Sequence, residues 1–398
     1  MSKLFSNIEL APIDPILGLS DLYRADSNPN KVNLGVGVYY DENGNIPIPK
    51  AVKVALERFV QNSKPFSYRA QNGTADYTEA VKKLILGEEL YSEKSKVCCT
   101  VQSLAGTGAL MLAANFLHKI TPNSTVYVSN PTWGNHKTIF GLAGFKIDEY
   151  PYYNDKTMSL DFDGMTEKLN SLEPKSIIVL HTCCHNPTGV DLNEEQWKKV
   201  AEIVKAKNLI PILDTAYQGF AEGLEEDAKA IRIFASEKIE TFVTTSFSKI
   251  FSLYGERIGA LTVICSDESE VEPVLSQIKV LIRSTYSTPP TFGASLVSTI
   301  LNDKELYEMW KSELESMRQR ILKVRKDLVI KIKEAGAKRS FDFIVNQKGM
   351  FSYTGLSKEQ VQQLKEDKHL YIVSSGRICV SAINDSNIDY VANSIALA

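Results

Sequence analysis

The stretch TFVTTSFSKIFSLYGERIGALTVIC, residues 241–265, joins two apolar runs, 241–246 and 259–265, that predict buried strands. Comparable apolar runs occur earlier in the chain, at 125–130, 176–181 and 209–214. Amphipathic helical patterns separate some of these runs, at 193–208 and 225–238. Because buried strands that alternate with helices are typical of parallel sheets covered on both faces, the sequence predicts an α/β fold with a mainly parallel sheet flanked by helices.

A second, smaller domain is expected from the C-terminal part of the chain. A long helical pattern runs from about Lys304 to Glu334, with Asn302 or Asp303 as its cap and Gly336 just after its end. Short runs typical of strands follow, in DFIVNQ (342–347), MFSYTG (350–355) and RICVSA (377–382). We expect an N-terminal arm and part of the small domain at 1–45, a large domain at 46–305, and the linking helix with a small α+β domain at 306–398.

The composition argues against several classes of partner. The 398 residues carry a net charge of -3, which gives no electrostatic reason to expect nucleic acid or an acidic membrane. No apolar run reaches the roughly 18 residues that a membrane span needs. The N-terminal residues MSKLFSNIELAPIDPILGL lack the apolar core of a signal peptide, so we expect a cytoplasmic protein. The six cysteines include two adjacent pairs in apolar stretches, and we expect them to be buried thiols.

Polar residues gather where the predicted strands stop. Asn186 follows the run at 176–181, Asp214 and Tyr217 end the run at 209–214, and Ser246 and Lys249 end the run at 241–246. Because ligands of parallel α/β sheets bind at the carboxyl ends of the strands, we expect these side chains in one site. A carboxylate in the place of Asp214 either caps the next helix or stays ionised and holds a proton on a ligand nitrogen.

Two further motifs allow more than one interpretation. Gly106-Thr107-Gly108 precedes a helical pattern, and the free N–H groups of a helix start suit a phosphate, although an ordinary helix start is equally compatible. The motif is not a dinucleotide fingerprint, because Met111 occupies the third glycine position. HTCCHNPTG (181–189) contains two histidines and two cysteines, but alternate residues of an extended strand face opposite sides and contiguous ligands rarely complete a zinc tetrahedron. We expect no metal there.

Lys249 has few charged neighbours in the sequence, and four interpretations of it are open. Lys249 could be an ordinary surface lysine or the lysine of a Ser-x-x-Lys acyl-enzyme that includes Ser246. It could also bind a nucleotide phosphate, or form a bond with the aldehyde of a cofactor. The acyl-enzyme class also needs Ser-Asp-Asn and Lys-Thr-Gly elements, which the sequence lacks, and no nucleotide-binding loop supports the clamp. An amine that attacks an aldehyde must be unprotonated, and burial beside a cation such as Arg257 lowers its pKa.

Taken together, these segments resemble the aspartate aminotransferase family, enzymes of fold type I that use pyridoxal 5'-phosphate. The resemblance rests on SFSKIFSLYGERIGAL, DTAYQGF, HNPTG, NPTWGNH, GTGAL, IRSTYSTPP and SSGRICV, and on APIDPILGL and NLGVGVYYDE near the N-terminus. It covers essentially the whole chain, in the family's order and spacing. It implies a seven-stranded sheet, a large domain that binds the cofactor, and a homodimer with shared active sites.

The activity that the resemblance implies is the reversible transfer of the amino group from L-aspartate to 2-oxoglutarate by a ping-pong mechanism. A broader enzyme that also accepts aromatic amino acids is the alternative within the family. Two alternatives belong to other classes of protein. A binding protein without activity is expected to lack Lys249, Asp214 or one of the arginines, all of which are present. A serine hydrolase is expected to react with a fluorophosphonate or β-lactam probe at Ser246.

The resemblance also implies a role for each residue of a cofactor site. Lys249 would bond the cofactor aldehyde and move the substrate proton, and Asp214 would pair with the protonated ring nitrogen. The other groups around the ring would be Tyr217 and Asn186 at its phenolic oxygen, Trp133 stacked on its face and His136 behind Asp214.

The same resemblance places two anion sites. The cofactor phosphate would be held by Gly106, Thr107, Ser246 and Arg257, with Tyr68 arriving from a second subunit. The substrate side would include Gly37, Trp133 and Asn186. Arg377 would bind the α-carboxylate, and Arg283 of a second subunit would bind the distal carboxylate. Ala105 stands where the family usually has a serine.

Overall fold

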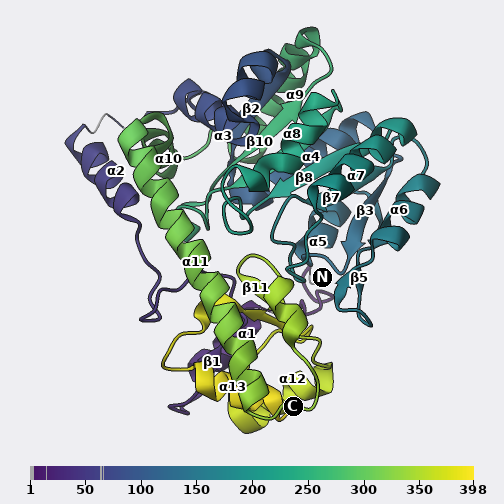
Figure 1. Ribbon diagram of the computed structural model, residues 1–398. Coiled ribbons are helices and arrows are strands. Elements are labelled where there is room, and N and C mark those ends of the chain that lie inside the picture. Colours follow the sequence, from purple (N-terminus) through teal and green to yellow (C-terminus); the bar gives the residue numbers. More distant parts are fainter. Residues whose placement is uncertain (1–3, 15, 63–64, 66) are drawn as a thin grey trace.

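A twisted seven-stranded sheet lies at the centre of the larger of two groups of elements in the computed structural model (Figure 1). The structure describes residues 4–14, 16–62, 65 and 67–398. The strands lie in the order β2-β10-β9-β8-β7-β3-β4. They are β2 (Cys98–Leu104), β3 (Thr125–Asn130), β4 (Lys146–Pro151), β7 (Ile177–His181), β8 (Ile210–Thr215), β9 (Thr241–Ser246) and β10 (Ile258–Ile264). β10 runs antiparallel to both its neighbours, while the pairs from β9 to β4 are parallel, so the expected mainly parallel sheet is confirmed.

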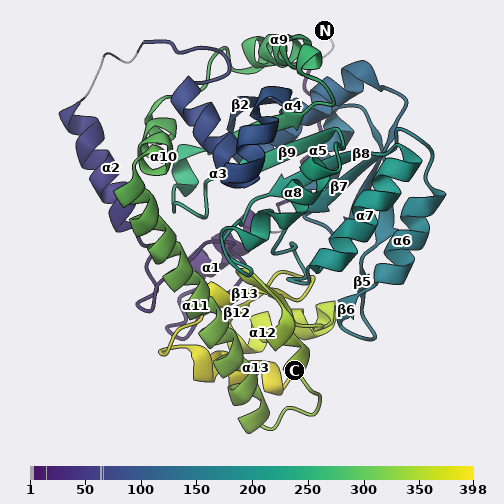
Figure 2. The ribbon, with the colours of Figure 1, turned by 45° about the horizontal axis from the view of Figure 1, so that its top comes forward.

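Helices cover both faces of this sheet (Figure 2). One face packs on α3 (Ala75–Lys94), α6 (Phe162–Ser171), α7 (Glu194–Lys207) and α8 (Lys229–Ser236), and the other on α4 (Ala105–Ile120), α5 (Asn135–Leu142) and α9 (Glu268–Thr285). Successive residues of one strand serve opposite faces. In β7, Ile178 and Leu180 belong to the first core, whereas Ile177 and Val179 belong to the second. This explains why the strands are continuous apolar runs in the sequence.

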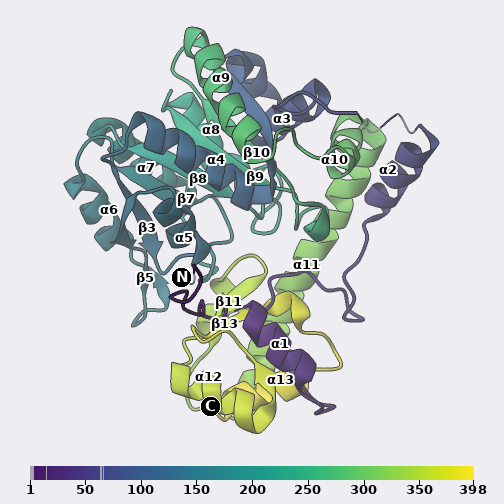
Figure 3. The same cartoon turned by 180° about the vertical axis from the view of Figure 1, so that it is seen from behind.

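The two ends of the chain meet in a second group of elements, called the terminal unit below (Figure 3). It contains α1 (Leu17–Ala25), β1 (Val32–Asn33), β11 (Phe351–Tyr353), α12 (Lys358–Lys368), β12 (Leu370–Tyr371), β13 (Arg377–Cys379) and α13 (Ile388–Ala396). β1 pairs with β12 in parallel, and β11 pairs with β13 in an antiparallel ladder. The domain limits derived from the sequence remain a prediction.

The long helix α11 (Lys304–Glu334) connects the sheet to the terminal unit. Its N-terminal cap is Asp303, whose carboxylate accepts a hydrogen bond from the N–H of Leu306 at 3.0 Å, and Gly336 follows its end with a φ of 81°. α2 (Lys50–Gln61) and α10 (Phe292–Asn302) pack beside its first turns, and the short hairpin β5 (Tyr153–Asn154) and β6 (Ser159–Leu160) lies at the other side of the sheet. In the described parts of the chain, no helix is both long enough and apolar enough to cross a membrane.

Three local expectations were wrong. Residues Asp342–Asn346 form a 3₁₀ helix rather than a strand, because Phe341 and Ile344 bury their side chains three positions apart instead of alternating. The helical pattern at 225–238 divides into a 3₁₀ turn, Glu226–Ala228, and α8. The strand at 176–181 does not continue beyond His181, and Cys184 has a φ of 51°.

Trp310 of α11 fixes the turn that carries Lys249. Its side chain is fully buried, its indole N–H donates to the carbonyl oxygen of Ile250 at 2.7 Å, and its ring stacks on Phe251 with the ring centres 4.4 Å apart. Stacked aromatic rings and a satisfied indole N–H both stabilise this contact. The long helix therefore holds the backbone directly after Lys249.

We expect Trp310→Ala to lower the free energy of unfolding of the cofactor-free protein by about 3–5 kcal/mol, because it leaves a large cavity under the turn. Trp310→Phe keeps a ring on Phe251 and loses the hydrogen bond, so the loss is about 1 kcal/mol plus the smaller ring's packing. Urea unfolding followed by tryptophan-independent circular dichroism measures both values. Lys326→Ala, at an exposed position of the same helix, is the control, and an equal loss in the control and in Trp310→Ala would contradict the assignment.

Candidate active site

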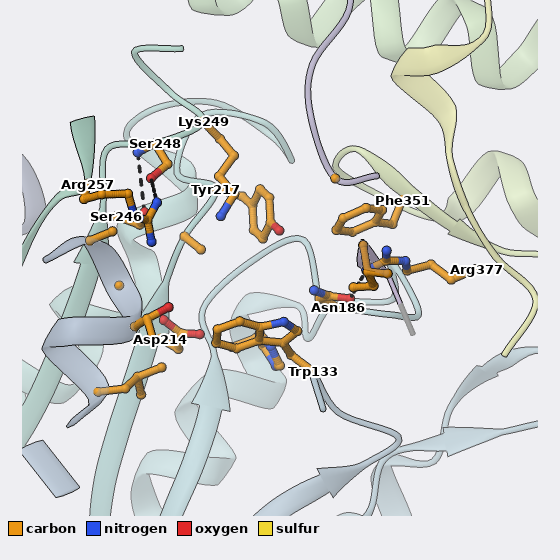
Figure 4. A pocket seen from close by; sticks show the side chains of 18 residues that line it. Trp133, Asn186, Asp214, Tyr217, Ser246, Ser248, Lys249, Arg257, Phe351 and Arg377 are labelled. Carbon is orange, nitrogen blue, oxygen red and sulfur yellow. Dashed lines mark hydrogen bonds between the residues drawn. The ribbon is translucent and has the colours of Figure 1, made fainter. Parts of the chain in front are cut away.

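A cavity of about 220 Å³ opens at the carboxyl ends of β7, β8 and β9, between the sheet and the terminal unit (Figure 4). The sheet supplies one wall, with His181, Asp214 and Ser246 at the strand ends. The terminal unit and the N-terminal residues that adjoin its helix α1 and strand β1 supply the other wall. The residues predicted from the sequence that line the cavity are Gly37, Gly106, Thr107, Trp133, Asn186, Asp214, Tyr217, Ser246, Lys249, Arg257 and Arg377.

Asp214 is a buried carboxylate that stays ionised. Thr244 donates to its Oδ1 at 2.8 Å, and Nε2 of His136 lies 3.2 Å from its Oδ2. Burial by itself would raise the pKa of Asp214, but these hydrogen bonds and the nearby imidazoles of His136 and His181 hold the pKa below its ordinary value. Asp214 does not cap a helix, so the first of the two interpretations made from the sequence is wrong.

His136 lies behind Asp214, away from the cavity, as the resemblance implies. Its ring is fully buried at the start of α5, and its Nδ1 lies 2.8 Å from the hydroxyl of Thr132. If the threonine hydroxyl donates to Nδ1, then Nε2 carries the proton and donates to Asp214. This arrangement directs Nε2 of His136 at the carboxylate of Asp214.

Lys249 reaches into the cavity from the turn between β9 and β10. Its amine has no hydrogen bond or ion pair with any residue that the structure describes, and it lies 5.0 Å from the centre of the Tyr217 ring. Burial lowers the pKa of Lys249 to about 8, and the positive charge of Arg257 adds to the decrease, while Asp214 opposes it. Roughly a tenth of this amine is therefore neutral and nucleophilic at pH 7, and about half at pH 8.

A cradle of donors for an anion lies beside the lysine, at the start of α4. Within the described residues no side chain caps this helix, and Gly106 and Thr107 of its first turn line the cavity at the positive end of the helix dipole. Arg257 donates to Ser248 Oγ at 3.3 Å and to the carbonyl of Tyr254 at 3.1 Å. The hydroxyl of Ser246 lines the same corner.

Gly259 allows this corner to form. A β-carbon at position 259 would lie 2.5 Å from the carbonyl carbon of Ala105 and 2.5 Å from the carbonyl oxygen of Thr245. Only a glycine lets β10 pass so close to the first residue of α4. Ala105 has a φ of 55° and donates its N–H to the carbonyl of Arg257 at 3.0 Å, so the helix start and the arginine are joined directly.

Arg377 holds the far end of the cavity. The guanidinium is buried, donates to Asn186 Oδ1 at 3.0 Å and to the carbonyl of Gly35 at 2.6 Å, and lies 4.1 Å above the ring of Phe351. Its Nε has no hydrogen-bond partner. Burial lowers the pKa of Arg377 without removing its charge at neutral pH.

Tyr217 and Trp133 enclose the middle of the cavity. Burial raises the pKa of Tyr217 well above the ordinary value, although Arg377 opposes the shift, so its phenol stays protonated and can donate a hydrogen bond. Trp133 presents its indole to the cavity and meets the His136 ring edge-on, with the ring centres 5.4 Å apart (Figure 4). The cavity lining contains three basic side chains and one acidic one, which favours ligands with negative charges.

The loop after β7 differs from the expected extended strand. Because the chain turns after His181, Cys183 and Cys184 do not face opposite sides, and their thiols gather with Asp227 in a compact group. Oδ1 and Oδ2 of Asp227 accept three backbone N–H groups at 2.8–2.9 Å, and the thiols stay protonated because burial raises the pKa of Cys184 well above its usual value. The geometric argument against zinc thus rested on a wrong backbone, while the thiols are buried as expected.

Two predicted residues lie outside the cavity of this single chain. Tyr68 is 90% exposed, and Arg283 is exposed at the end of α9, where its guanidinium contacts Ser287. In the described parts of the chain, neither residue belongs to the lining of the cavity.

Seven lining residues were not predicted as site residues from the sequence, namely Ile16, Ala105, Leu110, His181, Ala216, Ser248 and Phe351. Burial and the proximity of His136 lower the pKa of His181 to about 3, so it is neutral, and its Nδ1 has no partner. Phe351 belongs to the run MFSYTG, which indicated only a strand. A period-two pattern reports that one face is buried and contains no information about the cavity that this face meets.

The arrangement of these side chains indicates a class of protein. An amine of lowered pKa, an ionised aspartate and two arginines in one cavity suit an enzyme that handles anionic carbonyl compounds through an amine. Residues 29–395 match the sequence profile of the family "Aminotransferase class I and II". The chain belongs to this aminotransferase family.

Its relatives include two bacterial enzymes that align over nearly their full lengths. The aspartate aminotransferase of Pseudomonas aeruginosa is 48% identical over 393 residues, with 99% of each chain covered. The aromatic-amino-acid aminotransferase of Escherichia coli is 45% identical, again with 99% of each covered. Among solved structures, an aromatic-amino-acid aminotransferase from Burkholderia pseudomallei, covalently bound to pyridoxal phosphate, superposes with a TM-score of 0.96 at 50% identity and covers 100% of this chain and 99% of that one.

We expect Lys249 to be the most reactive lysine toward a small acylating reagent at pH 8. Its labelling rate should rise with pH and level off above about 8, because the neutral amine is the reacting form. Competitive labelling of the cofactor-free protein with acetic anhydride, read by peptide mass spectrometry, measures this profile.

Lys198 is the internal control, since hydrogen bonds with Glu195 and Glu194 raise its pKa. Its labelling should still be rising at pH 10. A Lys249 profile that follows that of Lys198 would show that the amine is an ordinary one.

Proposed function

We propose that this chain catalyses the reversible transfer of the amino group of L-aspartate to 2-oxoglutarate, giving oxaloacetate and L-glutamate by a ping-pong route, with pyridoxal 5'-phosphate as cofactor. The observation that carries the proposal is the pairing of Lys249, whose pKa burial lowers, with Asp214, which stays ionised in the same cavity. The aldehyde of this cofactor reacts with a neutral amine, and its protonated pyridine nitrogen is stabilised by an anion.

The residues of the cavity fit this cofactor. The start of α4, Ser246 and Arg257 offer hydrogen-bond donors for a phosphate at one end of the cavity. Arg377, which could bind a substrate carboxylate, lies at the other end. When bound, pyridoxal phosphate would supply an aldehyde that joins the substrate amine and a protonated ring that withdraws electrons from the substrate α-carbon.

Lys249 would carry the proton in the reaction. Its amine would take a proton from the substrate α-carbon as a base and would later give one back as an acid. A pKa near the working pH suits a group that must both accept and release a proton. Asp214, whose charge is maintained by Thr244 and His136, would hold a proton on the ring nitrogen.

The remaining groups would orient the ring and the substrate. Tyr217 and Asn186, which line the cavity, would donate hydrogen bonds to the phenolic oxygen of the ring, and Trp133 would stack on one face of the ring. Arg377 would bind the α-carboxylate, with its unpartnered Nε and its Nη atoms as donors. Gly37 lies against Phe351, so the segment around it forms the substrate side of the wall.

A homodimer with shared active sites would complete the cavity. Arg283 and Tyr68 are exposed in the single chain, and a second copy would bring them to the distal carboxylate and to the phosphate. The segment before α1 supports this proposal, because Leu4, Phe5, Ile8, Leu10 and Ile13 are each at least 70% exposed. A contiguous arm of exposed apolar side chains needs another surface to cover it. The cytoplasm, where an enzyme of central amino-acid metabolism would act, remains the proposed location.

Aromatic amino acids are the second candidate substrates. The cavity is bordered by the apolar side chains of Ile16, Trp133 and Phe351, which could contact a ring, and the relatives include an enzyme named for aromatic amino acids. Arg283 would distinguish the two candidate substrates. It would form an ion pair with the second carboxylate of aspartate, whereas a phenyl group would leave it without a partner.

We expect the purified protein with pyridoxal phosphate to turn over L-aspartate and 2-oxoglutarate at least about 100-fold more efficiently in kcat/KM than L-phenylalanine. Arg283→Leu should remove this preference by lowering kcat/KM for aspartate and sparing phenylalanine, while Lys249→Ala should abolish both activities. Coupled assays with each amino acid measure the ratio. Equal turnover of the two substrates that Arg283→Leu leaves unchanged would contradict dicarboxylate specificity.

We expect Lys249→Ala and Arg283→Leu proteins to complement each other when they are mixed, unfolded and refolded together. If Arg283 serves the cavity of the partner, each mixed dimer has one cavity with both defects and one intact cavity. Random pairing then restores about a quarter of the wild-type aspartate activity. Refolding each variant alone is the control, and no recovery in the mixture would contradict shared active sites.

A further inference from the structure

Arg325, in the middle of α11, is a buried cation that the proposed reaction does not use. Its side chain is 1% exposed, and it forms no ion pair with any carboxylate in the described parts of the chain. Burial lowers the pKa of Arg325 to about 10, so it remains charged at neutral pH. A buried charge costs more stability than an apolar residue of similar size in the same place. Arg325 therefore needs an explanation other than stability.

All the hydrogen bonds of Arg325 go to one short segment around β11. Its Nη2 donates to the carbonyl oxygen of Gly349 at 2.5 Å and to that of Phe351 at 3.2 Å, and its Nε donates to Ser352 Oγ at 3.3 Å. Its Nη1 has no partner. The guanidinium thus clamps the backbone before and after the side chain of Phe351.

That segment is the junction between the sheet and the terminal unit. The N–H of Lys348 donates to the carbonyl of Gly189 at 2.6 Å. Gly349, with a φ of 77°, passes so close to the loop after β7 that a β-carbon there would lie 2.4 Å from the β-carbon of Cys184. Two residues beyond Cys184 stands Asn186, which accepts a hydrogen bond from Arg377.

Phe351 transmits this geometry to the cavity. Its ring lies 4.1 Å from the guanidinium of Arg377, 6.0 Å from the ring centre of Tyr217, and directly against Gly37, where a β-carbon would be 2.6 Å away. A shift of the segment 349–352 would therefore move Phe351 and, with it, the surface on which Arg377 rests (Figure 4). Packed interiors transmit such shifts because they contain few voids.

We propose that Arg325 is a positioning residue for substrate carboxylate binding, acting through the segment 349–352 and Phe351 on Arg377. Arg325 touches neither the cavity nor any reacting atom. It sets the distance between the arginine of the terminal unit and the lysine of the sheet. The inference rests on the proposed function, since it assigns Arg377 to a substrate carboxylate.

The test compares Arg325→Met and Arg325→Lys with the wild type in the holoenzyme. Arg325→Met should raise KM for aspartate and for 2-oxoglutarate about tenfold with less than about threefold change in kcat, because a displaced Arg377 weakens binding in the ground state and in the transition state alike. Arg325→Lys keeps a positive charge and a donor near the same carbonyls, and its KM should lie between those of Arg325→Met and the wild type.

Succinate, a dicarboxylate with no reactive amino or oxo group, gives a readout that does not depend on turnover. Calorimetric titration of the holoenzymes should show the dissociation constant of succinate rising in the same order as KM. The matched control is Arg339→Met, which removes two arginine–carbonyl bonds of 3.0 Å, to Thr354 and Gly355, from the far end of the same strand. Its KM and succinate affinity should equal those of the wild type.

A merely structural role predicts a different pattern. Thermal midpoint and the fraction of enzyme with bound cofactor would then fall in the Arg325 variants, while KM and succinate affinity per active site stay at the wild-type values, and that result overturns the proposal. If Arg325→Met is insoluble, Arg325→Lys with unchanged KM and succinate affinity overturns it equally. A wild-type enzyme that transaminates nothing would instead refute the proposed function, which separates the two failures.

Discussion

The chemistry of this cavity depends on keeping a lysine partly neutral beside an aspartate that stays ionised. An amine and a carboxylate in one low-dielectric space ordinarily stabilise each other's charge, which would raise the pKa of Lys249 and make it inert. The structure prevents this outcome by supplying each group with its own surroundings. Asp214 is held by Thr244 and His136, whereas Lys249 is buried, has no hydrogen-bond partner among the described residues, and lies near the positive charge of Arg257.

This electrostatic separation requires the fold as a whole. The strand ends bring Asp214 and Thr244 together because β8 and β9 pair in parallel, with Asp214 directly opposite Thr244. The antiparallel β10 returns Arg257 to the start of α4, where the close approach at Gly259 joins the two. The helix α11 contacts the lysine turn through Trp310, and it contacts the segment that contains Phe351 through Arg325. One helix therefore supports both halves of the cavity.

Much of the sheet and of its polar edge could be predicted from the sequence, because local signals determine both. Continuous apolar runs ended by polar residues predicted β7, β8 and β9 to within one residue at each end, and Asp214 and Lys249 were singled out at their ends. The failures occurred where backbone direction changes without a glycine or proline at the turning point. Cys184 adopts a left-handed conformation that its sequence does not indicate, and residues Asp342–Asn346 form a 3₁₀ helix although they include strand-forming residues.

The sequence by itself determined the class of fold and the residues able to do amine chemistry, because hydrophobic periodicity and residue type are local properties, and the resemblance of its ordered motifs indicated the family. Only the tertiary structure decided how those residues act on one another. His136 reaches Asp214 across 78 positions of sequence, and Arg377 reaches Asn186 across 191. Charges and pKa values depend on distance and burial in space, and neither quantity is encoded by neighbours along the chain. The same reason left Phe351 and Arg325 unnoticed until the packing between the sheet and the terminal unit was known.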